Sequence, residues 1–130
     1  MKKTLLALFI ASITFISCDK APLPEYTVEG KWLWSPSEDR ADANTMWELS
    51  DGNIYTYYCL TCTGTSADND IYWNSLDSTD RLPAVESYTF DGDSLVWDGN
   101  SLGEIVFECD GGKLETASGM KLWRLSSDCQ

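Results

Sequence analysis

The chain carries the stretch Ser87-Tyr88-Thr89-Phe90-Asp91-Gly92-Asp93-Ser94-Leu95-Val96-Trp97, in which large apolar residues recur at every second position on both sides of a turn. This spacing predicts two strands with one buried face each, because successive side chains of a strand point to opposite sides. Asp91-Gly92 supplies the positive φ that a tight turn between strands requires. The stretch therefore predicts a β-hairpin.

The same pattern extends in both directions, and no window shows sustained helical spacing. Further glycine-containing turns occur at Asp51-Gly52, Asp98-Gly99, Asp110-Gly111-Gly112 and Ser118-Gly119. We expect eight strands, at Lys31–Ser35, Thr45–Leu49, Asn53–Cys59, Ser87–Phe90, Ser94–Trp97, Glu104–Cys109, Lys113–Thr116 and Lys121–Leu125. The pattern predicts an all-β fold, an antiparallel up-and-down meander.

Period two also divides the side chains between two faces. The predicted core consists of Trp32, Trp34, Trp47, Leu49, Tyr88, Phe90, Leu95, Trp97, Ile105 and Phe107. The opposite face carries mainly charged residues, as expected for a sheet with one face in water. The segment 60–86 is predicted to be a long polar loop, with at most a small turn or strand at Ile71-Tyr72-Trp73.

The residues before Cys18 follow the order of an export signal. Lys2 and Lys3 are followed by an almost entirely apolar run over residues 4–16 and then by the small Ser17. The stretch Phe15-Ile16-Ser17-Cys18 resembles a bacterial lipobox, which implies diacylglycerol on the Cys18 sulfur, cleavage before Cys18, and an acyl chain such as palmitate on the new amino group. The alternatives are an ordinary cleaved signal and a membrane helix, but the run falls short of the ~20 residues that a spanning helix needs.

This resemblance divides the chain into three parts. Residues 1–17 are the expected signal peptide, residues 18–29, with Pro22 and Pro24, the tether, and residues 30–130 a single domain. The implied location is the bacterial cell envelope, on the outer membrane or facing the periplasm. The expected membrane contact is through the N-terminal lipid.

The charge of the chain excludes several classes of function. It carries 21 acidic and 9 basic residues, and a surface this negative repels a phosphate backbone, so no nucleic-acid partner is expected. There is no histidine, which excludes Ser-His-Asp and Cys-His catalysis and removes the commonest zinc ligand. We expect no enzyme activity, no catalytic residues, no metal and no cofactor, and the sequence indicates no particular oligomeric state.

Four cysteines remain once Cys18 is assigned to lipid: Cys59, Cys62, Cys109 and Cys129. In an exported protein they predict two disulfides, with three pairings open. In a meander the strand ending at Cys59 finishes at the opposite end from the strands that lead to Cys109 and Cys129, and a disulfide needs Cα atoms within ~7 Å. This favours Cys59–Cys62 and Cys109–Cys129. A redox role for the first pair is disfavoured, because residues 63–66 are not expected to start the helix that such a site uses.

Four segments together resemble a small bacterial lipocalin-like lipoprotein domain. They are Gly30-Lys31-Trp32, which is a G-x-W at the first strand, an aromatic strand ending in Asp51-Gly52, the hairpin at 88–95, and the last strand Lys121-Leu122-Trp123-Arg124-Leu125. The resemblance implies a barrel whose base is formed by Gly30, Trp32 and Arg124, with the arginine lying across the tryptophan in a contact worth about 0.5–2 kcal/mol. It also implies a cup for a small hydrophobic molecule, with Trp34, Trp47, Phe90, Trp97 and Phe107 as lining candidates.

Alternatives to this cup remain open at the level of sequence. The large aromatic residues could fill the barrel themselves, since each buries ~150–250 Å². The main competing fold is a β-sandwich that binds carbohydrate or protein on an outer face, using Trp73, Tyr55 or Tyr57. An enzyme ranks third.

We predict that Cys18→Ala releases the protein from membranes or leaves its signal uncleaved. Lipid chains contribute about 0.8 kcal/mol of membrane binding per buried methylene, so the loss of the anchor is decisive. Membrane fractionation with intact-mass measurement checks this. A variant that is correctly processed and still wholly membrane-bound would contradict the lipobox assignment.

Overall fold

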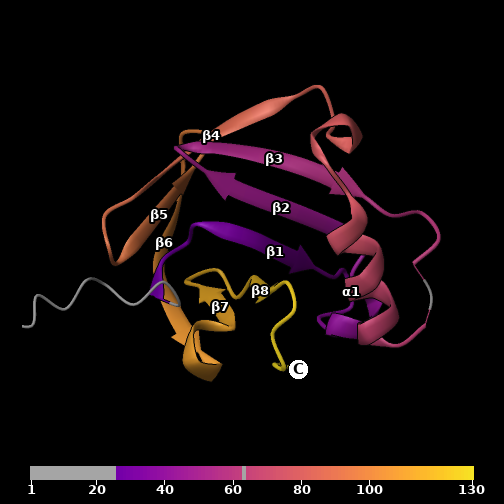
Figure 1. Cartoon of the computed structure of the whole chain (residues 1–130). Helices are drawn as coiled ribbons and strands as arrows, with labels where there is room; N and C mark the ends of the chain where they lie inside the picture. The colour runs from indigo at the N-terminus through magenta and orange to yellow at the C-terminus, as the bar shows by residue number, and fades with distance from the viewer. Residues whose placement is uncertain (1–25, 63) are drawn as a thin grey trace, which may run out of the picture.

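The computed structural model describes residues 26–62 and 64–130, and its eight strands close into an antiparallel barrel in which each strand pairs with its sequence neighbours (Figure 1). The strands are β1 (Gly30–Trp34), β2 (Thr45–Ser50), β3 (Asn53–Tyr58), β4 (Val85–Phe90), β5 (Ser94–Trp97), β6 (Asn100–Glu108), β7 (Lys113–Thr116) and β8 (Lys121–Arg124). The predicted meander is confirmed, and because β1 pairs with β8 the β-sandwich is excluded. Cys18, the signal peptide and most of the tether lie outside the described residues.

The barrel has two ends, which we call the base and the mouth. The base carries the turns at Asp51-Gly52 and Asp91-Gly92 and the short 3-10 helix η4 (Cys109–Gly111). The mouth carries the two long connections, residues 35–44 and 59–84, and the turn at Asp98-Gly99. Alternating strand direction fixes this division.

The barrel interior contains all ten predicted core residues. Trp32, Leu49 and Leu95 are at most 1% exposed, and Ile54, Leu114 and Leu122 join them in one apolar cluster. Trp34, Trp47, Phe90, Trp97 and Phe107 pack against this cluster while remaining partly exposed. The period-two assignment of inward residues is therefore confirmed.

Arg124 closes the base. Its guanidinium lies 4.2 Å from the Trp32 ring, and it donates hydrogen bonds to the backbone oxygens of Thr27 (2.8 Å), Glu29 (2.9 Å) and Gly111 (3.0 Å). Gly30 is required beside it, because a Cβ there would lie 2.8 Å from Arg124 Nη1, and its φ of +120° also favours glycine. The expected base of Gly30, Trp32 and Arg124 is thus assembled in the structure.

The residues just before β1 belong to the packed structure. Val28 is 1% exposed, and its carbonyl accepts a hydrogen bond of 2.8 Å from the Trp32 indole N–H. Tyr26 packs edge-on against Phe107, with ring centroids 6.0 Å apart. Part of the segment expected as tether therefore covers the base.

The long connection between β3 and β4 contains a helix, which the sequence analysis did not predict. Helix α1 spans Ser66–Ser75, and Thr65 caps it by accepting a hydrogen bond from the Asp68 backbone N–H. The expectation that residues 63–66 cannot start a helix was wrong, because Thr65 is itself a favourable N-cap. No helix in the described part of the chain is long and apolar enough to cross a membrane.

Helix α1 creates a second core on the outside of the barrel. Trp73 of α1 is fully buried against the outward side chains of Leu33, Met46 and Tyr57, which are also at most 1% exposed. The helix is held by Arg40 in the 3-10 helix η2 (Arg40–Asp42), whose guanidinium bonds both carboxylate oxygens of Asp70 at 2.8 and 2.9 Å. The prediction of a water-exposed outer face is therefore wrong for β1, β2 and β3.

The structure contains both predicted disulfides. Cys59–Cys62 lies at the mouth and Cys109–Cys129 at the base, with Cα atoms 5.6 and 6.1 Å apart. Three strands begin earlier than predicted: β1 at Gly30, β4 at Val85 and β6 at Asn100. The long β6 starts directly after the Asp98-Gly99 turn. Its pairing with β5 changes register between Leu95 and Val96 of β5.

We predict that Trp32→Ala lowers the free energy of unfolding by about 3–5 kcal/mol, as truncation of a fully buried aromatic side chain does. Arg124→Ala should lower it by less, and the double variant should lose less than the sum, because the two side chains share one contact. Urea denaturation of the four proteins measures the coupling. Strict additivity would mean that Arg124 does not close the base through Trp32.

Candidate functional site

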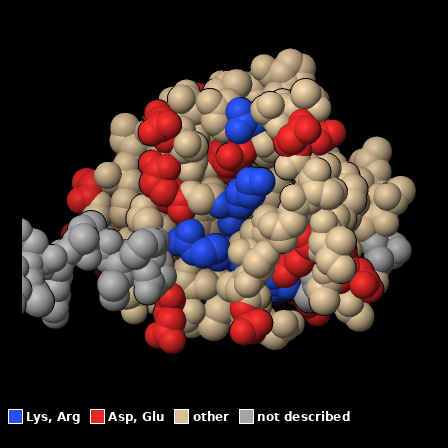
Figure 2. Space-filling view, viewed as in Figure 1, with Lys and Arg blue, Asp and Glu red and all other residues tan. Residues whose placement is uncertain are grey.

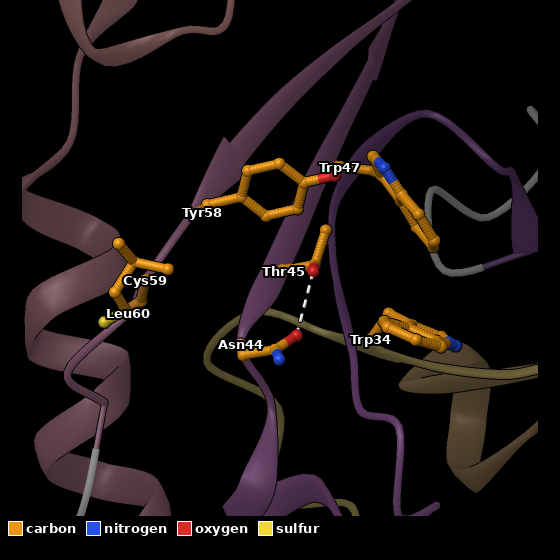
Figure 3. A pocket seen from close by; sticks show the side chains of 7 residues that line it. All are labelled: Trp34, Asn44, Thr45, Trp47, Tyr58, Cys59 and Leu60. Atoms are coloured by element: carbon orange, nitrogen blue, oxygen red, sulfur yellow. Dashed lines mark hydrogen bonds between the residues drawn. The ribbon is translucent and has the colours of Figure 1, made fainter.

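A pocket of ≈ 380 Å³ lies at the mouth of the barrel, on the side formed by β1, β2 and β3 (Figure 3). Register places its inward side chains: Trp34 stands opposite Thr45, and Thr45 opposite Tyr58. The lining residues are Trp34, Asn44, Thr45, Trp47, Tyr58, Cys59 and Leu60. The pocket is thus built where three strands reach the open end.

Aromatic rings form most of its wall. The ring centroids of Trp34 and Trp47 are 5.9 Å apart, and the two ring planes are inclined at 37°. Figure 3 shows both rings beside Thr45, with the Tyr58 side chain directed toward Trp47. Trp97 packs edge-on behind Trp47, with centroids 4.8 Å apart. These packed neighbours hold the ring of Trp47 in place.

Asn44 joins the two sides of the pocket through its backbone. Its N–H donates to the Trp34 carbonyl at 3.2 Å, and its carbonyl accepts from the Cys59 N–H at 2.9 Å. Its side-chain oxygen accepts a hydrogen bond of 2.9 Å from the Thr45 hydroxyl, drawn in Figure 3. The main polar groups of the floor therefore bond one another.

The rim exposes apolar groups. Tyr58 is 55% exposed, and Leu60 is 98% exposed in the short loop that the Cys59–Cys62 disulfide closes. Burying such surface is favourable at roughly 25 cal/mol per Å². An apolar molecule that entered the pocket would therefore gain from covering this rim.

The five predicted lining residues do not form one site. Trp34 and Trp47 line the pocket, and Trp97 supports Trp47 from behind. Phe90 and Phe107 lie toward the base, 6.3 Å apart, and take no part in the pocket.

The sequence analysis missed five lining residues: Asn44, Thr45, Tyr58, Leu60 and Cys59, the last of which was predicted only as a disulfide cysteine. Period two along β3 could have identified Tyr58, because it shares the inward face with Ile54 and Thr56. No alternation of this kind could have identified Leu60, because it lies beyond the end of β3, in the loop that the Cys59–Cys62 disulfide closes.

A separate cluster of titratable groups lies on the outer face. The Tyr57 hydroxyl donates to Glu48 at 2.7 Å, and Arg81 donates to both groups at 2.8 and 2.9 Å while lying over the Tyr55 ring. Burial alone would raise the pKa of Glu48, but the hydrogen bonds from Tyr57 and Arg81 hold this pKa below its ordinary value. Burial raises the pKa of Tyr57. These groups form hydrogen bonds with one another, and through Arg81 they hold the segment before β4 against β2 and β3.

The three aromatic residues named for an outer carbohydrate face are not available together. Trp73 and Tyr57 are buried, and Tyr55 is covered by Arg81. Within the described ranges, no group of three or more Cys, Asp or Glu side chains is placed to hold a metal ion. Two further hollows of ≈ 330 and ≈ 350 Å³ have at most one aromatic residue in their described lining, so the mouth pocket with its three aromatic residues is the candidate site.

We predict that replacing Cys59 and Cys62 together by alanine lowers the free energy of unfolding by about 2 kcal/mol, as the loss of a very short closed loop does. The barrel should stay folded, since Cys109–Cys129 ties the other end. Urea denaturation under non-reducing conditions measures the change. Leu60→Ser is the control, and it should leave the free energy of unfolding unaltered because the Leu60 side chain is in water. The prediction would be contradicted if the double cysteine variant lost as much stability as a core truncation does.

The chain was compared with family models, with curated proteins and with solved structures, and none of them matches it. Its function is therefore inferred from the pocket and its surroundings.

Proposed function

We propose that this protein is a lipid-anchored lipoprotein of the bacterial envelope whose barrel holds a small hydrophobic molecule in the mouth pocket. The observation that carries the proposal is the contrast between the two ends. The base is sealed by Trp32 and Arg124, while the mouth keeps a pocket of ≈ 380 Å³ with aromatic walls. This volume falls in the range of about 300–1,000 Å³ that small-molecule sites occupy.

The filled interior limits where the ligand can lie. Trp32, Ile54 and Leu95 are fully buried and occupy the barrel below the pocket. A molecule bound at the mouth would therefore rest against Trp34 and Trp47 and would not thread the barrel. The ligand is accordingly short, with part of it in contact with the rim.

The lining also favours binding over catalysis. Tyr58 is the one titratable side chain among the lining residues, because the Cys59 sulfur is in a disulfide. General acid–base chemistry is carried most often by His, Glu, Asp or Lys side chains, and the described lining of the pocket contains none of these. We therefore propose that the protein is not an enzyme.

Two observations support export and anchoring. The two disulfides are typical of an oxidising compartment outside the cytoplasm. The described chain enters the barrel at the base, where Thr27 and Glu29 bond Arg124, so an anchor at Cys18 would join the end opposite the pocket. That arrangement would keep the pocket accessible.

Mass spectrometry of the native protein extracted from membranes tests the proposal as a whole. It should report lipid on Cys18, both disulfides and a co-purifying small molecule. An unlipidated N-terminus would contradict the anchoring.

We predict that a neutral, water-soluble aromatic probe, benzyl alcohol, binds at the mouth. Titration followed by the NMR signals of the indole N–H groups should shift Trp34 and Trp47 and leave Trp73 unchanged. Leu60→Ser should weaken binding about threefold, since it removes apolar contact at the rim.

Ile71→Ser is the matched control. Ile71 is a 71% exposed aliphatic residue on helix α1 and does not line the pocket. Equal weakening by the two variants, or binding that shifts neither Trp34 nor Trp47, would contradict the proposed site.

A further inference from the structure

The mouth pocket presents aromatic rings together with an absence of positive charge. Trp34, Trp47 and Tyr58 line it, and its lining within the described residues includes no lysine or arginine. The face of an aromatic ring carries negative potential, most strongly in tryptophan. Three such rings around one cavity create an environment that favours a positively charged group.

Several basic groups on the same side of the barrel are paired with acids. Lys121, which lies in the neighbouring groove on the other side of Trp34, forms an ion pair of 2.7 Å with Glu38. Arg40 and Arg81 are paired with Asp70 and Glu48. In Figure 2 basic side chains gather toward the middle of one face, while acidic side chains are spread over its outline.

A carboxylate lies inside the barrel behind the pocket. Glu86 stands opposite the inward Ile54 in register, and it accepts a hydrogen bond of 2.8 Å from the Trp97 indole N–H. Within 26–62 and 64–130 it forms no ion pair. Trp97 packs directly against Trp47, so this negative charge is separated from the pocket wall by a single layer of rings.

From these features we infer that the ligand of the mouth pocket is an organic cation whose positive group, such as a quaternary ammonium, rests against Trp34, Trp47 and Tyr58. The inference rests on the proposed function of the pocket and names the chemical class of its ligand. A quaternary ammonium needs no hydrogen-bond acceptor, which suits a floor whose polar groups, Asn44 and Thr45, bond each other. Its apolar part would lie along Leu60 at the rim.

The overall charge acts in the same direction. The chain has a formal net charge of −12, and clefts in strongly charged proteins concentrate ions of opposite sign and speed their arrival. The same field disfavours anionic ligands such as fatty-acid carboxylates.

The test compares choline with 3,3-dimethylbutan-1-ol, its uncharged carbon isostere, on the full lipid-anchored chain in neutral detergent micelles. Both are titrated while the indole N–H signals of Trp34 and Trp47 are followed. Choline should bind about tenfold more tightly than the alcohol, as expected for a cation against several ring faces. This preference should fall with added salt, because the negative field is screened.

Two variants separate charge recognition from apolar contact. Tyr58→Leu and Trp34→Leu keep apolar surface and remove one ring, so each should reduce the preference for choline several-fold while retaining the alcohol. Tyr58 is 55% exposed, which makes its substitution the safer one for folding. Tyr72→Leu on helix α1 is the matched control, since Tyr72 is partly exposed and outside the pocket.

Equal affinity for choline and the alcohol, or tighter binding of the alcohol, would overturn the inference. If benzyl alcohol still shifts Trp34 and Trp47 in that case, the proposed binding function stands and only the ligand class is wrong. If none of the three probes shifts these signals, both the proposed binding function and the inferred ligand class are wrong. A preference for choline that Tyr58→Leu and Trp34→Leu leave intact would also overturn the assignment to these rings.

Discussion

The barrel depends on the contact between Arg124 and Trp32, because this contact joins the last strand to the first. The guanidinium covers the indole ring and at the same time satisfies backbone carbonyls from the N-terminal segment and from η4. One planar donor group thus connects β1, β8 and both segments that cross the base. Because this contact seals the base, a pocket in the barrel can open only at the mouth.

Local sequence signals predicted the barrel well and its outer layer poorly. Hairpins depend on neighbouring residues, so alternation and the glycine turns located all eight strands, and strand direction then gave the disulfide pairs. Helix α1 was missed because its apolar residues Ile71, Tyr72 and Trp73 are consecutive and show no helical period. Its stability comes from distant partners, Arg40 and the outer face of β1–β3, which no local window contains.

The candidate site was predictable only in part for the same reason. Period two shows that Trp34, Trp47, Phe90, Trp97 and Phe107 point inward, but it does not say at which height along the barrel each one lies. Height depends on register between strands, which placed Phe90 and Phe107 near the base. Leu60 reached the rim through a disulfide loop, and Glu86 acquired its inward position through a strand that begins earlier than the alternation suggested.

The second core makes the barrel wall uneven. β1, β2 and β3 are covered on both faces, by the interior cluster and by Trp73 and its neighbours, whereas β5 and β6 pack on their inner face and leave Val106 in water. Free energies of local opening follow the density of buried contacts, so amide hydrogen exchange should be slower in β1, β2 and β3 than along β5 and β6. The pocket therefore lies in the part of the barrel where local opening should be rare. The opposite wall, formed by β5 and β6, should open more often.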